Sequence, residues 1–150
     1  MAQRTGSRAA WIIGLTAMIL LMVNTALFEM QTVSAQSQPH KVVAYYFHTN
    51  TRCSTCMKIE AYSHEAIEEG FKTEIKNETL ELRVVNYEEP ENRHYIKDYK
   101  LVTKSLILVN LVDGKQTEWM NLKLVWELTK NKDAFLNYVR KEVRNYLSKG

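Results

Sequence analysis

The two cysteines of the chain, Cys53 and Cys56, are the residues whose type and spacing could carry chemistry. Ser54 and Thr55 separate them, an apolar run typical of a strand precedes them, and a run typical of a helix follows. A pair with this spacing at a strand-to-helix junction can close a disulfide within one helical turn. The helix N-terminus would stabilise the thiolate of the first cysteine. The pattern therefore predicts thiol–disulfide redox chemistry with Cys53 and Cys56 as the reacting residues.

Two other functions stay open for this cysteine pair. It could be a structural disulfide in a non-catalytic binding module, although so short a bridge removes little chain entropy. It could also bind a metal, and His48 is then the nearest further ligand, at the end of the preceding strand. Three ligands make at most an open site. We therefore predict that the protein has no metal and no cofactor, and we keep metal binding by the cysteine pair as an alternative.

A β-branched and aromatic run at residues 42–47 predicts a central strand buried on both faces, and helical spacing predicts a helix over residues 54–69. The other expected elements are a strand at 80–87, a short helix from about 90 to 99, a strand at 106–112, an Asp113-Gly114 hairpin turn, a strand at 115–122, a helical turn at 124–129 and an amphipathic helix at 133–147. Two parallel connections followed by a hairpin predict an α/β fold, with a central mixed sheet of about four strands flanked by helices on both faces.

Residues outside the cysteine motif are given structural roles. Trp119 and Trp126 are expected to pack in the core, and so are Tyr45 and Tyr46 in the first strand. The basic residues of the last helix are expected on its solvent side, namely Arg140, Lys141 and Arg144.

The first 35 residues have the composition of an export signal. Arg4 and Arg8 precede an apolar run at residues 9–23, and Val33-Ser34-Ala35 offers small residues for a signal peptidase. Extended to Phe28, the apolar run reaches about 20 residues, which is long enough for an uncleaved anchor. We predict a signal peptide or membrane anchor at 1–35, a linker at 36–40, and one folded domain at 41–150. The domain would lie outside the cytoplasm, in the periplasm or on the outer face of the cytoplasmic membrane.

The charge balance says little about partners. A net charge of +3 over 150 residues gives no strong nucleic-acid field. The expected partner is a protein or small-molecule thiol or disulfide, with a membrane redox protein as one candidate. We expect the protein to be a monomer.

The order of elements, with Cys-x-x-Cys after the first strand, resembles the thioredoxin fold over about residues 41–147. Further matching stretches are Tyr-Tyr-Phe at residues 45–47, Tyr-x-Leu-Val at 99–102 and Asp-Gly at 113–114. Within that superfamily, Lys-Ile-Glu-Ala-Tyr at 58–62 and Val-Trp-Glu-Leu at 125–128, with Tyr-Val at 138–139, are similar to small exported bacterial proteins of the ArsF family. That family name implies no settled reaction.

The thioredoxin resemblance implies a role for each residue of the motif. Cys53 would be the exposed attacking thiolate, and Cys56 the buried resolving thiol one turn into the helix. Arg52 would add a positive charge that favours the thiolate. Ser54 and Thr55, which replace Gly-Pro, would set the redox potential in a direction that the sequence does not give.

Three positions depart from the thioredoxin pattern. Arg52 stands where the family has a tryptophan, and the buried acid of the first strand, expected near Phe47, is absent. Ser105 stands where the family has a cis-proline facing the disulfide, since the chain holds only Pro39 and Pro90. Without that proline the loop before the third strand loses its preference for a cis bond.

Overall fold

A computed structural model describes residues 40–150 of the chain. The predicted signal or anchor at 1–35, and all of the linker except His40, lie outside these residues. His40 itself already belongs to the first strand, one residue before the predicted start of the domain. No helix within residues 40–150 is both long enough and apolar enough to cross a membrane.

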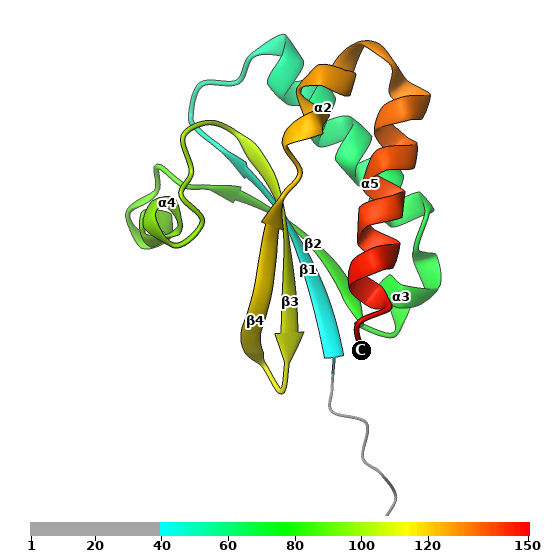
Figure 1. Cartoon of the computed structure of the whole chain (residues 1–150). Coiled ribbons are helices and arrows are strands. Elements are labelled where there is room, and N and C mark those ends of the chain that lie inside the picture. Colours follow the sequence, from blue (N-terminus) through cyan, green and yellow to red (C-terminus); the bar gives the residue numbers. More distant parts are fainter. Residues whose placement is uncertain (1–39) are drawn as a thin grey trace, which may run out of the picture. The chain divides into compact units, whose positions relative to one another are not determined.

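The four strands form one mixed sheet in the order β2-β1-β3-β4 (Figure 1). They are β1 (His40–His48), β2 (Leu80–Asn86), β3 (Ser105–Val112) and β4 (Lys115–Asn121). β1 pairs parallel with β2 and antiparallel with β3, and β3 pairs antiparallel with β4. Residues 42–47 of β1 are all buried. The prediction of a central strand covered on both faces is confirmed.

One predicted connection is wrong. We expected the link from β2 to β3 to be parallel, but β3 runs antiparallel to β1 and therefore to β2. A parallel link must return the chain along the whole sheet, which over the eight residues of β3 is about 26 Å. The helix in this link, α4 (His94–Asp98), has five residues and spans only about 7.5 Å. The chain therefore leaves and re-enters the sheet at the same end.

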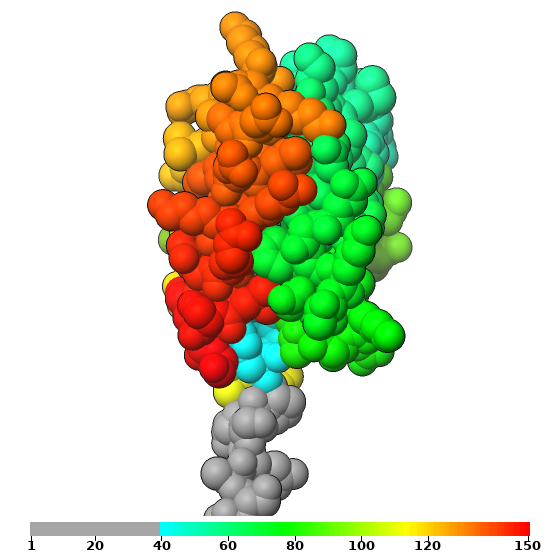
Figure 2. All heavy atoms as spheres, turned by 90° about the vertical axis from the view of Figure 1, so that its right-hand side faces the viewer, coloured from blue at the N-terminus to red at the C-terminus, as the bar shows by residue number. Residues whose placement is uncertain are grey.

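Helices cover both faces of the sheet, as predicted, but unequally (Figure 1). One face packs against α2, α5 and the short segments next to them, whose buried side chains join one core cluster with the sheet. Figure 2 shows α5 beside the η1 and α3 segments on this helix-covered face. Within residues 40–150, the other face packs against Tyr95 of α4 and against Tyr99, which follows this helix. The elements of the helix-covered face are α2 (Ser54–His64), η1 (Glu65–Glu69), α3 (Lys72–Lys76), η3 (Lys123–Val125), η4 (Glu127–Lys130) and α5 (Lys132–Leu147). A short 3₁₀ turn, η2 (Pro90–Asn92), precedes α4 in the link from β2 to β3.

The predicted helix at 54–69 is present, but its last five residues form a π-helical turn. Arg140 of α5 donates from Nε to the carbonyl oxygen of Ala66 at 3.3 Å, and from a terminal nitrogen to that of Glu65 at 3.5 Å. A side chain at Gly70 would place its Cβ 2.4 Å from the Ala66 oxygen, so only glycine fits there. Arg140 thus joins α5 to η1, and its predicted place on the solvent side is wrong.

The hairpin between β3 and β4 turns at Asp113 and Gly114, as predicted. Both residues have positive φ, 52° and 72°, which is the backbone of a type I′ turn. A parallel β-α-β unit, followed by this hairpin and a C-terminal helix, surrounds a strand-to-helix junction that carries Cys-x-x-Cys. The protein therefore has a thioredoxin-like α/β fold.

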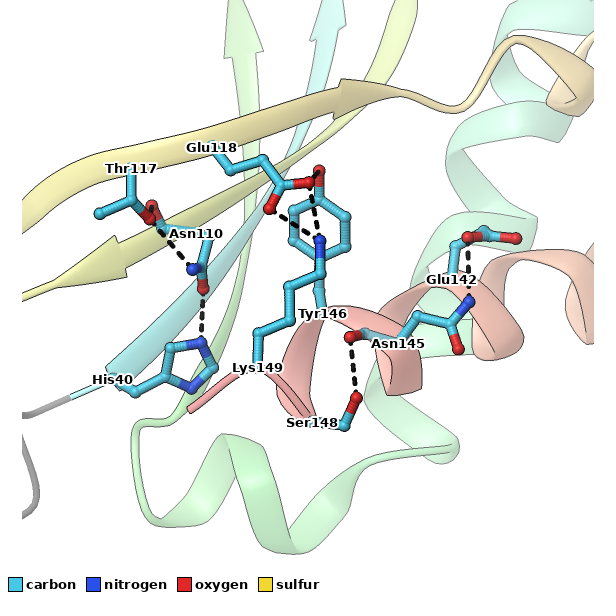
Figure 3. Close-up of polar contacts among 9 residues, drawn as sticks. All are labelled: His40, Asn110, Thr117, Glu118, Glu142, Asn145, Tyr146, Ser148 and Lys149. Carbon is cyan, nitrogen blue, oxygen red and sulfur yellow. Dashed lines mark hydrogen bonds and ion pairs between the residues drawn. The ribbon is translucent and has the colours of Figure 1, made fainter.

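The end of the helix-covered face farthest from the cysteines is closed by polar groups (Figure 3). Asn110, 6% exposed, donates from Nδ2 to the Thr117 hydroxyl at 3.0 Å and accepts from His40 through Oδ1. His40 must therefore carry its hydrogen on Nε2. Both carboxylate oxygens of Glu118 lie 2.7 Å from the Lys149 ammonium. The polar atoms at this end are thus paired with one another.

Candidate functional site

Cys53 and Cys56 form a disulfide at the start of α2, with their Cα atoms 5.0 Å apart. Cys53 is the N-cap of the helix and is exposed, whereas Cys56 is fully buried. Ser54, exposed, and Thr55, half-buried, lie in the first turn between them. The arrangement is the one predicted: one accessible sulfur at the helix N-terminus and its partner beneath. The redox roles of these four residues stay a prediction.

Hydrogen bonds hold the loop that leads into Cys53 in place. Asn50 donates its backbone N–H to the Glu88 carboxylate at 2.7 Å, and its side-chain oxygen accepts from Asn86 at 2.7 Å. Thr49 donates its hydroxyl to the carbonyl oxygen of Thr51 at 3.1 Å. These bonds tie the loop to the end of β2, so the position of Cys53 is set by the sheet as well as by the helix.

The backbone around Cys53 is suited to an anionic sulfur. The Cys56 N–H donates to the Cys53 Sγ at 3.1 Å, and the Met57 N–H donates to the Cys53 carbonyl oxygen at 3.0 Å. After reduction, a Cys53 thiolate in this place would keep a backbone donor and the partial positive charge of the helix N-terminus. Both favour the thiolate over the thiol.

Arg52 does not present a free charge to Cys53. Its guanidinium forms an ion pair with Glu60, one turn beyond Cys56, and both side chains border a surface groove of about 570 Å³. The carboxylate offsets much of the positive charge at short range. The effect of Arg52 on the thiolate therefore stays a prediction.

Tyr46 is the residue of the site that sequence reasoning missed. Its hydroxyl donates to the carbonyl oxygen of Cys56 at 2.7 Å, and its side chain is fully buried. Burial raises the pKa of Tyr46 to about 12, although the positive charge of Arg52 acts in the opposite direction. Tyrosine in an apolar strand indicates core packing, with stacking on a substrate as the alternative. The need of a buried hydroxyl for a hydrogen-bond partner was the available signal.

The thioredoxin resemblance implies a buried acid near Phe47, where the sequence has none. The structure puts Phe47 on the opposite face of the sheet, in the cluster that packs against Tyr99. Side chains alternate along a strand, so Tyr46 is the neighbour that faces α2. The β1 side chain that reaches the Cys56 backbone is therefore the Tyr46 phenol.

Ser105 lies at the same end of the sheet as the cysteine loop, because it pairs in register with Phe47 near the end of β1. It is 4% exposed, and its hydroxyl donates to the Thr103 carbonyl oxygen at 2.9 Å. Its peptide bond, like the others within residues 40–150, is trans. The Trp126 indole N–H donates to the Lys104 carbonyl oxygen at 3.0 Å. Trp126, expected only to pack, thus holds the loop that lacks the proline.

Metal ligands do not gather at the cysteines within the described part of the chain. No group of three or more His, Cys, Asp or Glu side chains in residues 40–150 is placed to hold a metal ion. His48, the nearest candidate by sequence, turns Nδ1 toward the carbonyl oxygen of Thr49 at 3.0 Å. The geometry therefore gives no support to a three-ligand centre.

Comparison with known proteins gives likenesses only among solved structures. No protein-family model and no curated protein matches the chain. The crystal structure of Trxlp from Edwardsiella tarda EIB202 is 13% identical, covering 70% of this chain and 84% of that one, with a TM-score of 0.40. Fasciola hepatica thioredoxin is 15% identical, covering 73% and 90%, with a TM-score of 0.38. Likenesses this distant carry no argument. The fold assignment rests on strand order, register and the place of the cysteines.

Proposed function

We propose that this protein is a thiol–disulfide oxidoreductase that works through Cys53 and Cys56. The observation that carries the proposal is the exposed Cys53 sulfur at the N-cap of α2, bonded to a fully buried Cys56. An inert staple has no need of an accessible sulfur next to backbone donors. An attacking thiolate needs both.

When the protein is oxidised by a partner disulfide, the Cys53 thiolate attacks one of the two partner sulfurs. A mixed disulfide forms, and one partner thiolate leaves with the electron pair of the broken bond. Cys56 then loses its proton and attacks the Cys53 sulfur, which releases the second partner thiolate. The protein gives up two electrons and two protons, and the partner takes them up as two thiols. The reverse sequence oxidises a dithiol partner.

The partner we propose is a polypeptide thiol or disulfide. Three exposed apolar side chains lie in segments that meet at the cysteine end of the sheet: Met57, 52% exposed, Val102, 96%, and Leu124, 44%. Such side chains can dock an apolar peptide segment around a reacting sulfur. A small-molecule disulfide, or an extramembrane part of a membrane redox protein, would use the same sulfur.

We further propose that the domain acts outside the cytoplasm as an electron-transfer protein, and that it belongs to the ArsF family. This rests on the sequence of residues 1–35 and on the similarity of residues 58–62 and 125–128 to that family. An oxidising compartment would keep the pair as a disulfide until a donor reduces it. Detection of the chain in a periplasmic or membrane fraction, with the amino-terminal sequence of its mature form, tests this part.

A non-catalytic binding module is the second candidate. Arg52 and Ser105 favour it, because they replace the tryptophan and the proline of the thioredoxin pattern. A redox titration separates the two. Catalysts fall between about −270 and −120 mV, whereas a structural disulfide lies below about −300 mV. A metal-binding dithiol, the third reading of the pair, would take up metal in stoichiometric amount after reduction.

Two serine variants test the proposed function. Each removes one cysteine, so both lose the disulfide and each serves as the control for the other. Cys56→Ser should trap a mixed disulfide between Cys53 and a model substrate with intact disulfides, such as native insulin, seen as a shifted band on a non-reducing gel. Cys53→Ser should form none, and neither variant should speed the dithiothreitol-dependent reduction of insulin. Parental activity in Cys53→Ser, or equal trapping by both variants, would refute the assignment.

A further inference from the structure

We infer that Tyr46 is a positioning residue for Cys56, the resolving cysteine. Its hydroxyl ties the Cys56 backbone to the central strand and keeps the first turn of α2 in place while the disulfide is open. The inference rests on the proposed function and assigns a role to a residue outside the cysteine motif.

The geometry is a direct link from sheet to helix. Tyr46 lies on the helix-covered face of β1, with Val42 and Ala44. Its hydroxyl reaches the Cys56 carbonyl oxygen at 2.7 Å in a fully buried position. No water competes for a bond buried in this way, so it keeps its strength. The carbonyl that it holds belongs to the residue whose sulfur must complete the reaction.

The link gains importance when the disulfide opens. In the oxidised protein the S–S bond itself fixes Cys56 relative to Cys53. In the mixed disulfide that bond is gone, and the Cys53 sulfur, which accepts the Cys56 N–H in the oxidised form, is bonded to the partner. The Tyr46 hydroxyl bond does not involve either sulfur. It therefore remains to hold Cys56 within reach of Cys53.

The hydroxyl acts as a donor and not as a base. Because burial raises the pKa of Tyr46 to about 12, the phenol keeps its proton at neutral pH. The phenol therefore does not take the Cys56 proton, which we assign to solvent or to the departing partner thiolate. Arg52, the charged neighbour that acts on this phenol, is itself paired with Glu60. Removing the Tyr46 hydroxyl should slow the resolving step without changing its pH dependence.

The test separates the two chemical steps with equimolar 5,5′-dithiobis(2-nitrobenzoate) and the fully reduced protein. Attack by Cys53 releases one chromophoric thiolate, and attack by Cys56 on the mixed disulfide releases the second in a concentration-independent phase. Tyr46→Phe removes only the hydroxyl. Tyr99→Phe is the matched control, since Tyr99 is also buried and donates its hydroxyl to Gln116 at 2.8 Å, but on the opposite face.

We expect Tyr46→Phe to slow the second phase about fivefold, which is about 1 kcal/mol at 1.36 kcal/mol per tenfold. The first phase should stay within twofold of the parent, and Tyr99→Phe should match the parent in both phases. A parental second phase in Tyr46→Phe overturns the inference. So does equal slowing of both phases, or equal slowing by Tyr99→Phe, because each would report general loosening of the fold.

The same time courses of thiolate release distinguish failure of the Tyr46 inference from failure of the proposed function. A parent that releases only one equivalent, or a Cys53→Ser variant with a parental first phase, overturns the oxidoreductase assignment and the Tyr46 inference with it. Thermal unfolding of the reduced Tyr46→Phe protein supplies a second measurement. A folded variant with a parental midpoint and a slow second phase supports positioning, whereas a lowered midpoint with a parental second phase shows a structural bond only.

Discussion

Tyr45 and Tyr46 are neighbours in β1, yet they belong to two different layers of the molecule. Tyr46 faces α2 and α5, within a mainly aliphatic core, and donates to the Cys56 backbone. Tyr45 faces α4, stacks on Phe47 with ring centroids 5.3 Å apart, and accepts from Arg83 at 3.2 Å. One face of the sheet is closed by helices, and the other mainly by aromatic side chains lying against one another.

The difference indicates which layer of the molecule fixes the geometry of the two cysteines. Cys56 is buried on the helix-covered face, whose core fixes α2 against the sheet. The face that carries Tyr45 and Phe47, the aromatic face, stabilises the sheet and ends in partly exposed ion pairs, among them Lys41 and Glu81 at 2.7 Å. We therefore expect changes on the helix-covered face to cost more stability, and changes on the aromatic face to leave the cysteines unaffected.

The largest effect should come from the helix-covered core. Phe135 is fully buried and meets Tyr62 edge-on at 5.4 Å. Phe135→Ala should lower the free energy of unfolding by about 3–5 kcal/mol, because it leaves a cavity between α5 and α2. Tyr95→Ala, at a half-buried ring of the aromatic face, should cost only about 1–2 kcal/mol. Urea unfolding measures both. An equal or larger loss in Tyr95→Ala would remove the distinction between the faces.

The next effect concerns the joint between α5 and the π-helical turn. Arg140→Met keeps much of the side-chain volume but removes the donors to the Glu65 and Ala66 carbonyl oxygens. We expect a loss of about 1–2 kcal/mol and faster amide exchange over residues 65–70. Arg144→Met, at an exposed position of the same helix, should change stability by less than about 0.5 kcal/mol. If the two variants behave alike, Arg140 does not hold this turn.

A pH effect should appear at the edge of the aromatic face. The Arg83 guanidinium, with Lys41, lowers the pKa of Glu81 from 4.5 to about 2. Since folding lowers this pKa, the stabilisation is present above about pH 5 and is lost as the pH falls toward 2. Glu81 is partly exposed, so Glu81→Gln should cost only about 0.5–1 kcal/mol at pH 7.

Unfolding curves of the parent and Glu81→Gln, taken from pH 7 down to pH 2, check this effect. The difference between the two proteins should shrink steadily below pH 5. Glu91→Gln, in the exposed η2 turn, should follow the parent throughout. A gap between parent and Glu81→Gln that stays constant with pH would rule out the ion pairs as its source.

The smallest effect is expected from Tyr45→Phe. The change removes one long hydrogen bond from Arg83, which keeps its bond to Glu81 at 2.9 Å. The stability should change by less than about 0.5 kcal/mol, and both phases of the reaction with 5,5′-dithiobis(2-nitrobenzoate) should be parental. Comparison with Tyr46→Phe then tests, at two adjacent residues, whether only the helix-covered face supports the cysteines. A slowed second phase in Tyr45→Phe would show that the cysteines also depend on the aromatic face.

Local patterns predicted most of the elements, because each depends on residues close together in the chain. The apolar run at 42–47 became the central strand, and Asp113-Gly114 became the hairpin turn, since few other residues accept positive φ at both positions. The direction of β3 was predicted wrongly. The end of the sheet at which an 18-residue link re-enters depends on how its short helices pack. The spacing of apolar residues along the chain does not encode this packing.

The sequence by itself determined that a Cys-x-x-Cys pair follows a buried strand and opens a helix, because strand burial and helix capping are written in neighbouring residues. Only the tertiary structure decided which distant groups surround the pair. Tyr46, Trp126 and Arg140 all looked like ordinary core or surface residues, yet each donates a hydrogen bond to a backbone carbonyl in a distant segment of the chain. Such bonds depend on how strands and helices meet across the sheet, and no local pattern of residues specifies that meeting.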